Sequence, residues 1–150
     1  MAVRVAGGGA VTVGLLGCGT VGQAVVRSIN EGGGTIERAS GHRLQVGPIL
    51  VRDPAAPRPG VDPALITTDP ARVLDDPSVS IVIEVMGGLD PTLGYLRRAL
   101  ARGASVVTAN KQLMARHGPE LLLAAEQSGA ELRFEASACA AIPVIKVLRE

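Results

Sequence analysis

Hydrophobic positions follow two different spacings along this chain, and their alternation predicts strands followed by helices. Val11–Leu16 is a short, mostly apolar and partly β-branched run, which is typical of a buried strand in a parallel sheet. Apolar residues then recur every fourth position, on one face of a helix: Val21, Val25 and Ile29. We expect this helix to end near Asn30, because the glycine-rich residues 31–41 favour a loop.

The rest of the chain continues this alternation of short apolar runs and helical patterns. Further strands are predicted at Leu44–Val51, Val79–Met86, Ala104–Val107 and Glu131–Ala136. Helices are predicted from Pro70 to about Leu74, from Asp90 to Gly103, over Pro119–Ser128 and from Ile142 to Arg149. The sequence therefore predicts an α/β fold of the Rossmann type, a doubly wound, mainly parallel sheet with helices on both faces.

Three glycines at the spacing G-x-G-x-x-G join the first strand to the first helix. Gly17 allows a tight reversal, Gly19 leaves room for a pyrophosphate, and Gly22 lets the helix approach the strand. The first amides of the helix have no carbonyl partners, so they attract phosphate. Thr20 either caps the helix or adds its hydroxyl to the phosphate shell. We expect residues 17–22, with Val21 among them, to bind a dinucleotide; alternatively, the glycines only make a tight turn.

Arg52 and Asp53 follow the second predicted strand, which meets the adenosine ribose in dinucleotide-binding folds. Asp53 would accept hydrogen bonds from the ribose hydroxyls of NAD, whereas Arg52 would pair with the 2′-phosphate of NADP. The two neighbours therefore leave the choice between NAD and NADP open. Asp53 precedes Pro54, so it is alternatively no more than a turn residue.

Composition narrows the class of protein. The chain has 150 residues, a net charge of +1 and no basic block, so nucleic acid and anionic membranes are not expected partners. No apolar run approaches the roughly 18–20 residues of a membrane helix. Two cysteines, Cys18 and Cys139, are too few for a disulfide framework and fit a reducing cytoplasm. We expect Cys18 to be a small buried residue.

Two later strands also end in residues suited to a ligand. Gly87 and Gly88 follow one strand, and Thr108–Lys111 follows the next, at the edge where open α/β sheets bind ligands. Glu84 interrupts an apolar strand, so it either faces the strand end or is buried and paired. These two strand ends are candidates for the remainder of the site.

Four segments resemble homoserine dehydrogenase, in the same order and at similar spacing. They are Gly17–Gly22, Glu84–Gly88, Val106–Lys111 and Glu135–Ser137 with Ile142-Pro143. The resemblance covers the chain from about Val11 to its end, and the last two segments are more specific than the glycine turn. That family interconverts L-homoserine and L-aspartate 4-semialdehyde with NADPH or NADH, on the route to threonine, methionine and isoleucine.

The resemblance implies roles for the residues at the strand ends. Gly87, Thr108 and Asn110 match residues near the nicotinamide and its ribose, and Lys111 matches the lysine at the reacting centre. Hydride delivery to an aldehyde builds negative charge on oxygen, so a nearby cation or proton donor suits the reaction. Alternatively, Lys111 is a surface lysine that opens a helix.

The resemblance also implies a substrate and cation region near the end of the chain. Glu135 matches a glutamate that binds substrate and lies near a monovalent cation; alternatively, it is an exposed strand residue. Ala138 and Ala140 stand at the positions expected to complete a Na⁺ site. The chain departs from the family pattern here, because residues 138–141 read Ala-Cys-Ala-Ala where the family has Val and a glycine-containing turn.

Chain length defines the expected domain organisation. We expect residues 1–10 to form a flexible tail and residues 11–150 an NAD(P)-binding domain that lacks the family's second, substrate-binding and dimer-forming domain. The isolated chain is then expected to bind cofactor without turnover, and to form homo-oligomers only with that second domain. The alternatives are a standalone dinucleotide-binding sensor or a related amino-acid dehydrogenase.

Overall fold

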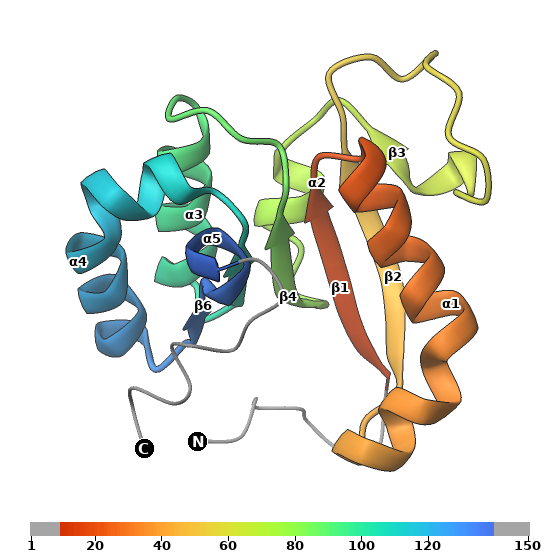
Figure 1. Cartoon of the computed structure of the whole chain (residues 1–150), viewed down its shortest axis with the longest axis horizontal. Helices are drawn as coiled ribbons and strands as arrows, with labels where there is room; N and C mark the ends of the chain where they lie inside the picture. The colour runs from red at the N-terminus through yellow and green to blue at the C-terminus, as the bar shows by residue number, and fades with distance from the viewer. Residues whose placement is uncertain (1–9, 140–150) are drawn as a thin grey trace.

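The computed structural model describes residues 10–139, which form a six-stranded sheet (Figure 1). Its strands are β1 (Val11–Leu16), β2 (Leu44–Leu50), β3 (Ile66–Thr67), β4 (Val79–Glu84), β5 (Ser105–Thr108) and β6 (Leu132–Arg133). The strand order is β3-β2-β1-β4-β5-β6, and every pairing is parallel. This order reverses between β1 and β4, so the predicted doubly wound Rossmann-type sheet is confirmed.

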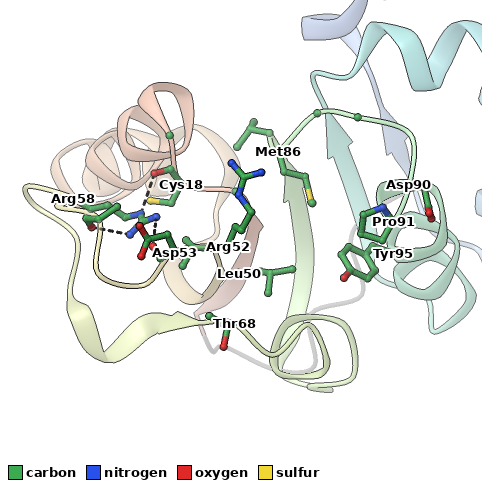
Figure 2. Close-up of a pocket in the computed structure, with 17 residues that line it drawn as sticks. Cys18, Leu50, Arg52, Asp53, Arg58, Thr68, Met86, Asp90, Pro91 and Tyr95 are labelled. Carbon is green, nitrogen blue, oxygen red and sulfur yellow. Dashed lines mark hydrogen bonds between the residues drawn. The ribbon is translucent and has the colours of Figure 1, made fainter.

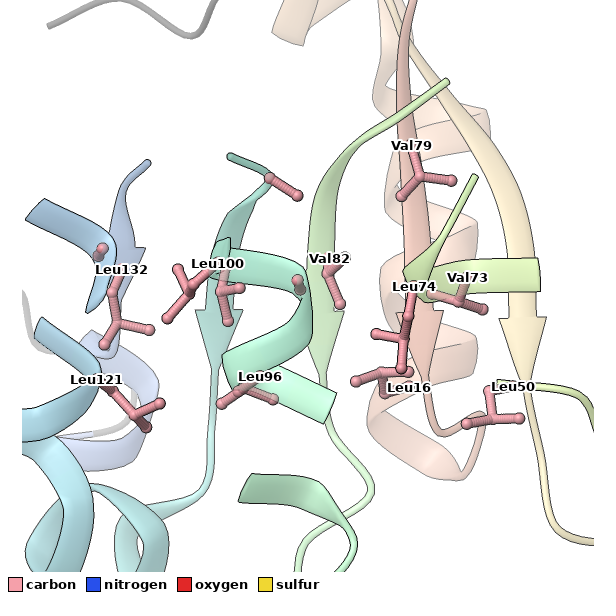
Figure 3. Packing of buried hydrophobic residues seen from close by; sticks show 14 of the residues in the cluster. Leu16, Leu50, Val73, Leu74, Val79, Val82, Leu96, Leu100, Leu121 and Leu132 are labelled. Atoms are coloured by element: carbon pink, nitrogen blue, oxygen red, sulfur yellow. The ribbon is translucent and has the colours of Figure 1, made fainter. Parts of the chain in front are cut away.

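Helices cover both faces of the sheet, as the sequence predicts. They are α1 (Thr20–Ser40), α2 (Ala71–Leu74), α3 (Thr92–Ala101), α4 (Lys111–Ser128) and α5 (Glu135–Cys139), with a short 3₁₀ helix η1 (Pro63–Leu65). One apolar cluster joins α1 to the sheet through Val26 and Ile29. A second cluster, drawn in Figure 3, joins α2, α3 and α4 to the opposite face. No helix among the described residues is long and apolar enough to cross a membrane.

The first strand shows why both faces need cover. All six residues of β1 are buried, with Val13 and Leu15 in the first cluster and Leu16 in the second. Successive side chains of a strand point to opposite faces, so a strand that is buried along its whole length requires a helix layer on each side. The glycine turn that follows β1 is therefore attached to the best-buried strand of the sheet.

The predicted end of the first helix near Asn30 is wrong. α1 continues through the three glycines to Ser40 and ends at Gly41, whose φ of 73° is left-handed. The Gly41 amide donates to the Glu37 carbonyl at 2.8 Å, which is a common way to close a helix. Glycine costs a helix interior about 1 kcal/mol relative to alanine, but it does not prevent the backbone hydrogen bonds that continue the helix.

The predicted start of the fourth helix at Pro119 is also wrong. α4 begins at Lys111 and carries Pro119 inside it. Leu113 and Leu121, on either side of the proline, are both fully buried in the second cluster, so tertiary packing keeps the two halves in one helix. A proline in a helix interior costs about 3 kcal/mol, and the burial of the apolar face offsets that cost.

The last predicted strand is shorter than expected. β6 covers only Leu132 and Arg133, and Glu135 is the first residue of α5. The predicted strand position of Glu135 is therefore wrong, because the chain leaves the sheet after pairing with β5. Residues 1–9 of the predicted tail over residues 1–10 lie outside the described residues, as does the predicted helix over 142–149.

Candidate dinucleotide-binding site

Two of the three turn glycines are required by space and conformation. Gly17 has a φ of +102°, and a Cβ built there would lie 2.9 Å from the backbone nitrogen of Met86. A Cβ at Gly22 would lie 2.6 Å from the Gly17 carbonyl oxygen. The turn, the start of α1 and the end of β4 are therefore in such close contact that only glycine fits at these two positions.

Gly19 differs from its neighbours, because a Cβ built there would meet no atom within 4 Å. It is the N-cap of α1, without a side-chain cap, and its carbonyl accepts the first helical hydrogen bond from Gln23 at 3.0 Å. The amides of residues 20–22 consequently precede the hydrogen-bonded ladder. Thr20 is the first helical residue, so its predicted alternative role as the cap is wrong. Open space beside unpaired amides fits a pyrophosphate.

A pocket of about 880 Å³ opens beside this turn (Figure 2). The residues that line it come from the ends of β1, β2 and β4, from the loop after β2 and from the start of α3. Its volume is within the range of about 300–1,000 Å³ that is usual for ligand sites. The pocket lies where the strand order reverses, which is where open parallel sheets bind ligands.

Several of the predicted site residues meet in this pocket. Gly17, Gly19, Arg52, Asp53 and Gly87 all line it, although they come from three different strand ends. Val21 is 56% exposed at the start of α1, next to the turn but outside the residues that line the pocket. Thr108, Asn110, Lys111 and Glu135 are also absent from its wall.

The loop after β2 is tied to the glycine turn by an arginine that the sequence analysis did not single out. The Arg58 guanidinium donates from Nε to the Cys18 carbonyl at 3.2 Å and from Nη2 to the Asp53 carbonyl at 2.9 Å. The Asp53 side chain accepts from the Ala55 amide at 2.9 Å, and this hydrogen bond forms a local turn within the loop. In the described part of the chain, exposed Arg52 forms no hydrogen bond and no ion pair.

Cys18, inside the glycine turn, is buried as predicted, with 6% of its surface exposed. Burial raises the pKa of the Cys18 thiol above its usual value, and the adjacent Arg58 guanidinium only partly opposes this shift. A thiol with a raised pKa is a poor nucleophile near neutral pH. Cys18 therefore fills space beneath the turn.

Glu84 is fully buried at the end of β4, which resolves the two alternatives that the sequence left open. Its Oε1 accepts hydrogen bonds from the Met86 and Gly87 amides, both at 2.9 Å. Its Oε2 accepts from the Thr108 hydroxyl at 2.5 Å. A buried carboxylate needs such partners, because leaving it without hydrogen bonds would be costly.

The same network continues through the residues after β5. Thr108 Oγ1 accepts from the Asn110 amide at 3.0 Å, and Asn110 Nδ2 donates to the Gly88 carbonyl at 2.6 Å. The Asn110 Oδ1 caps α4 by accepting from the Leu113 amide at 3.0 Å. The side chains of Thr108 and Asn110 are thus engaged within the protein, and they connect the start of α4 to the wall of the pocket.

Lys111 and Glu135 each occupy the first position of a helix at the carboxyl edge of the sheet. Lys111 is exposed at the start of α4, and Glu135 is half-buried at the start of α5. Ala138 is exposed in α5, whereas Ala140 lies outside the described residues. Within residues 10–139, no three His, Cys, Asp or Glu side chains gather as a metal site would require.

The sheet order, the glycine turn and the pocket at the reversal point together define a Rossmann-type dinucleotide-binding domain. The family model for the NAD-binding domain of homoserine dehydrogenase matches residues 17–135. The chain belongs to this family of nicotinamide dinucleotide-binding domains.

Sequence relatives support the same assignment. Homoserine dehydrogenase from Corynebacterium glutamicum is 44% identical over 142 residues, covering 95% of this chain and 32% of the relative. The Bacillus subtilis enzyme is 42% identical and covers 94% of this chain and 33% of its own length. The chain therefore spans about a third of the length of these curated relatives.

Solved structures agree with the sequence relatives. A homoserine dehydrogenase from Thiobacillus denitrificans superposes with a TM-score of 0.84 at 39% identity, over 95% of this chain and 33% of that one. A hyperthermophilic archaeal homoserine dehydrogenase in complex with NADPH superposes with a TM-score of 0.73 at 26% identity, over 92% of this chain and 47% of that one.

Proposed function

We propose that this chain is the cofactor-binding part of a homoserine dehydrogenase, which interconverts L-homoserine and L-aspartate 4-semialdehyde. The observation that carries this proposal is the hydrogen bond from Asn110 to the Gly88 carbonyl. This bond holds the Thr108–Lys111 segment against a loop that lines the dinucleotide pocket. The same segment is one of the more specific points of resemblance to homoserine dehydrogenase. Lys111 then begins α4 next to the edge where the nicotinamide is expected.

The position of Lys111 supports a chemical role. A cation at a helix N-terminus opposes the helix dipole and costs about 0.3–1 kcal/mol. Among the described residues, Lys111 has no acidic partner that would offset this cost. The bound nicotinamide accepts or supplies the hydride, and the Lys111 ammonium would stabilise the negative charge that develops on the substrate oxygen.

The phosphate-binding part of the proposal rests on residues 17–22. The amides of Thr20, Val21 and Gly22 would bind the pyrophosphate in the space above Gly19, and the Thr20 hydroxyl would add one more donor. Glu135 would bind the substrate amino group or a monovalent cation such as Na⁺, with the positions of Ala138 and Ala140 completing the cation site. Thr108 and Asn110 would act near the nicotinamide indirectly, by holding the backbone of the loop that ends at Gly88.

For the cofactor itself we propose NADP(H) in preference to NAD(H). The Asp53 Oδ1 accepts from the Ala55 amide, so this carboxylate also serves the turn of its own loop. Arg52 lines the pocket with an exposed guanidinium, which suits a 2′-phosphate. In the view of Figure 2, Asp53 lies between Arg52 and Arg58.

Two measurements test the function. The purified chain is titrated with NADPH, NADP⁺ and NADH by calorimetry, and saturable binding is expected. Residues 1–150 are then joined to the remaining C-terminal part of the Corynebacterium glutamicum enzyme, and homoserine-dependent reduction of NADP⁺ is measured. Absence of dinucleotide binding would contradict the proposal, and binding without turnover in a folded chimaera would favour the sensor alternative.

The cofactor preference has its own test. Arg52→Ala is expected to weaken NADPH binding by about tenfold, because one charge-assisted hydrogen bond to phosphate is lost. NADH binding should change by less than about twofold, since NADH lacks the 2′-phosphate that Arg52 would bind. Arg116→Ala, which removes the same charge from the exposed surface of α4, serves as the matched control. Equal losses for NADPH and NADH would show that Arg52 does not read the 2′-phosphate.

A further inference from the structure

Glu84 has no part in the function proposed above, yet it is 0% exposed and accepts three hydrogen bonds. It does not line the dinucleotide pocket, so it cannot contact a ligand there directly. Two of its three donors are the amides of Met86 and Gly87, which do line the pocket. Any effect of Glu84 on a bound cofactor therefore passes through this loop or through Thr108.

The loop of residues 86–88 has little structure of its own to hold it. Gly87 and Gly88 both have a φ of 73°, in the left-handed region, and both are exposed. Glycine in solution has the widest conformational freedom of any residue, so such a loop is ordered only if its polar groups are held. The shape of this wall of the pocket depends on those groups.

Four hydrogen bonds from three directions hold the loop. Glu84, at the end of β4, binds the Met86 and Gly87 amides from beneath. The Thr92 hydroxyl, at the start of α3, donates to the Gly87 carbonyl at 2.8 Å, and Asn110 donates to the Gly88 carbonyl. Glu84 also joins β4 to β5 through the Thr108 hydroxyl, so the four bonds form one connected network.

We propose that Glu84 is a positioning residue, which fixes the loop of residues 86–88 as the surface against which the nicotinamide half of the cofactor lies. This inference rests on the proposed function, since it requires a bound dinucleotide. In dinucleotide-binding sheets of this order, the adenosine half lies towards β2 and the nicotinamide half towards β4. The carboxylate is specific for this task. Both of its oxygens act as acceptors, whereas an amide in its place would present a donor to Thr108 or to the loop amides.

The experiment separates the two halves of the cofactor. The 150-residue chain and its Glu84→Gln variant are titrated with NADPH and with 2′-phospho-ADP-ribose, which lacks only the nicotinamide. Glu84→Gln is expected to weaken NADPH binding by about tenfold, the effect of disturbing one hydrogen bond to a charged group. Binding of 2′-phospho-ADP-ribose is expected to weaken by a smaller factor, because its adenosine and 2′-phosphate contacts come from the loop after β2 and only Met86 of the 86–88 loop packs against the glycine turn.

Two further variants keep the result decisive. Glu126→Gln removes the same charge from the exposed face of α4 and should bind both ligands as the unmodified chain does. Asn110→Ser retains a capping oxygen for α4 but loses the donor to the Gly88 carbonyl, so it should show the same split even if Glu84→Gln fails to fold.

The outcomes distinguish the inference from the proposed function. Unchanged binding of both ligands, or equal weakening of both, in Asn110→Ser and in folded Glu84→Gln would overturn the positioning role. If the unmodified chain binds neither ligand, the proposed function is wrong, and the inference about Glu84 is wrong as well. A larger loss of affinity for NADPH than for 2′-phospho-ADP-ribose, in variants whose thermal unfolding shows a folded chain, supports the role of Glu84.

Discussion

The three glycines of the turn after β1 have different reasons to be glycine. Gly17 is held by its left-handed backbone and by contact with Met86, and Gly22 by contact with the Gly17 carbonyl. Gly19 has a φ of −82° and open space around it, so neither conformation nor packing excludes a side chain there. What remains to explain Gly19 is a ligand that approaches the backbone.

This difference predicts opposite behaviour for two alanine variants. Gly19→Ala should keep the free energy of unfolding within about 0.5 kcal/mol of the unmodified chain, because its methyl group enters open space. It should nevertheless weaken NADPH binding by about tenfold or more, since the methyl group lies where the pyrophosphate would contact the turn. Gly22→Ala should destabilise the fold by about 1–3 kcal/mol through its clash with the Gly17 carbonyl.

Urea unfolding and calorimetric titration of the two variants check this prediction. The control is Gly94→Ala, in α3, where a Cβ also meets no atom within 4 Å but which does not line the pocket. Normal NADPH affinity in Gly19→Ala would mean that the space above this glycine is not the phosphate site.

At the scale of elements, the apolar runs of β1, β2, β4 and β5 were enough to predict their positions and the class of fold, because each lies wholly or mostly within the sheet. The errors arose where the signal was a breaker residue. Gly32–Gly34 and Pro119 weaken a helix locally, but burial of an apolar face or a good C-terminal cap decides whether it continues. β3, two residues long, has no pattern to detect.

The candidate site likewise contains residues whose position follows from the strands and others whose position does not. Gly17, Gly19, Arg52 and Gly87 line one pocket because each stands at a strand end, and strand ends meet at one edge of a parallel sheet. Arg58 was missed because it acts from an irregular, proline-rich loop whose path depends on three carbonyl contacts. Glu84 stands out in the sequence as a charge within an apolar strand, but its partners do not. Thr108 lies 24 residues further along the chain, and the Met86 and Gly87 amides belong to a loop whose conformation the local sequence does not specify.

The continuous α1 makes a prediction about its glycines. Gly33→Ala should stabilise the chain by about 0.5–1 kcal/mol, because alanine loses less backbone entropy than glycine on forming a helix. A Cβ at this position meets no atom within 4 Å, so no clash offsets the gain. Gly60→Ala, in a loop with a φ of 79°, is the matched control and should destabilise instead.

Chemical denaturation of both variants measures these changes, and far-UV circular dichroism follows the helix content. If Gly33→Ala lowers the free energy of unfolding, residues 31–40 do not form a helix in solution and the loop expected from the sequence would be restored.

At the scale of the whole molecule, the two halves of the sheet form opposite walls of the pocket. The β1–β2 side, closed by Arg58, forms the part of the pocket expected to hold the adenosine half. The β4–β5 side, held by Glu84 and Asn110, forms the opposite wall. Lys111 and Glu135 begin helices farther along the same carboxyl edge, outside the pocket. Under the proposed function, a substrate would approach these two residues from beyond the nicotinamide.

The chimaera with the Corynebacterium glutamicum C-terminal part allows the role of Lys111 to be measured. Lys111→Ala should lower kcat for homoserine oxidation by about 10²–10³-fold, the usual cost of removing one group that stabilises a developing oxyanion. NADP⁺ affinity should change by less than about threefold, because the pocket wall does not include Lys111. Stability should not fall, since removing a cation from the N-terminus of α4 relieves an unfavourable interaction with the helix dipole. Arg116→Ala, on the exposed surface of the same helix, should leave kcat unchanged. A Lys111→Ala chimaera with near-normal kcat would show that the ammonium stands at the helix start for a reason other than catalysis.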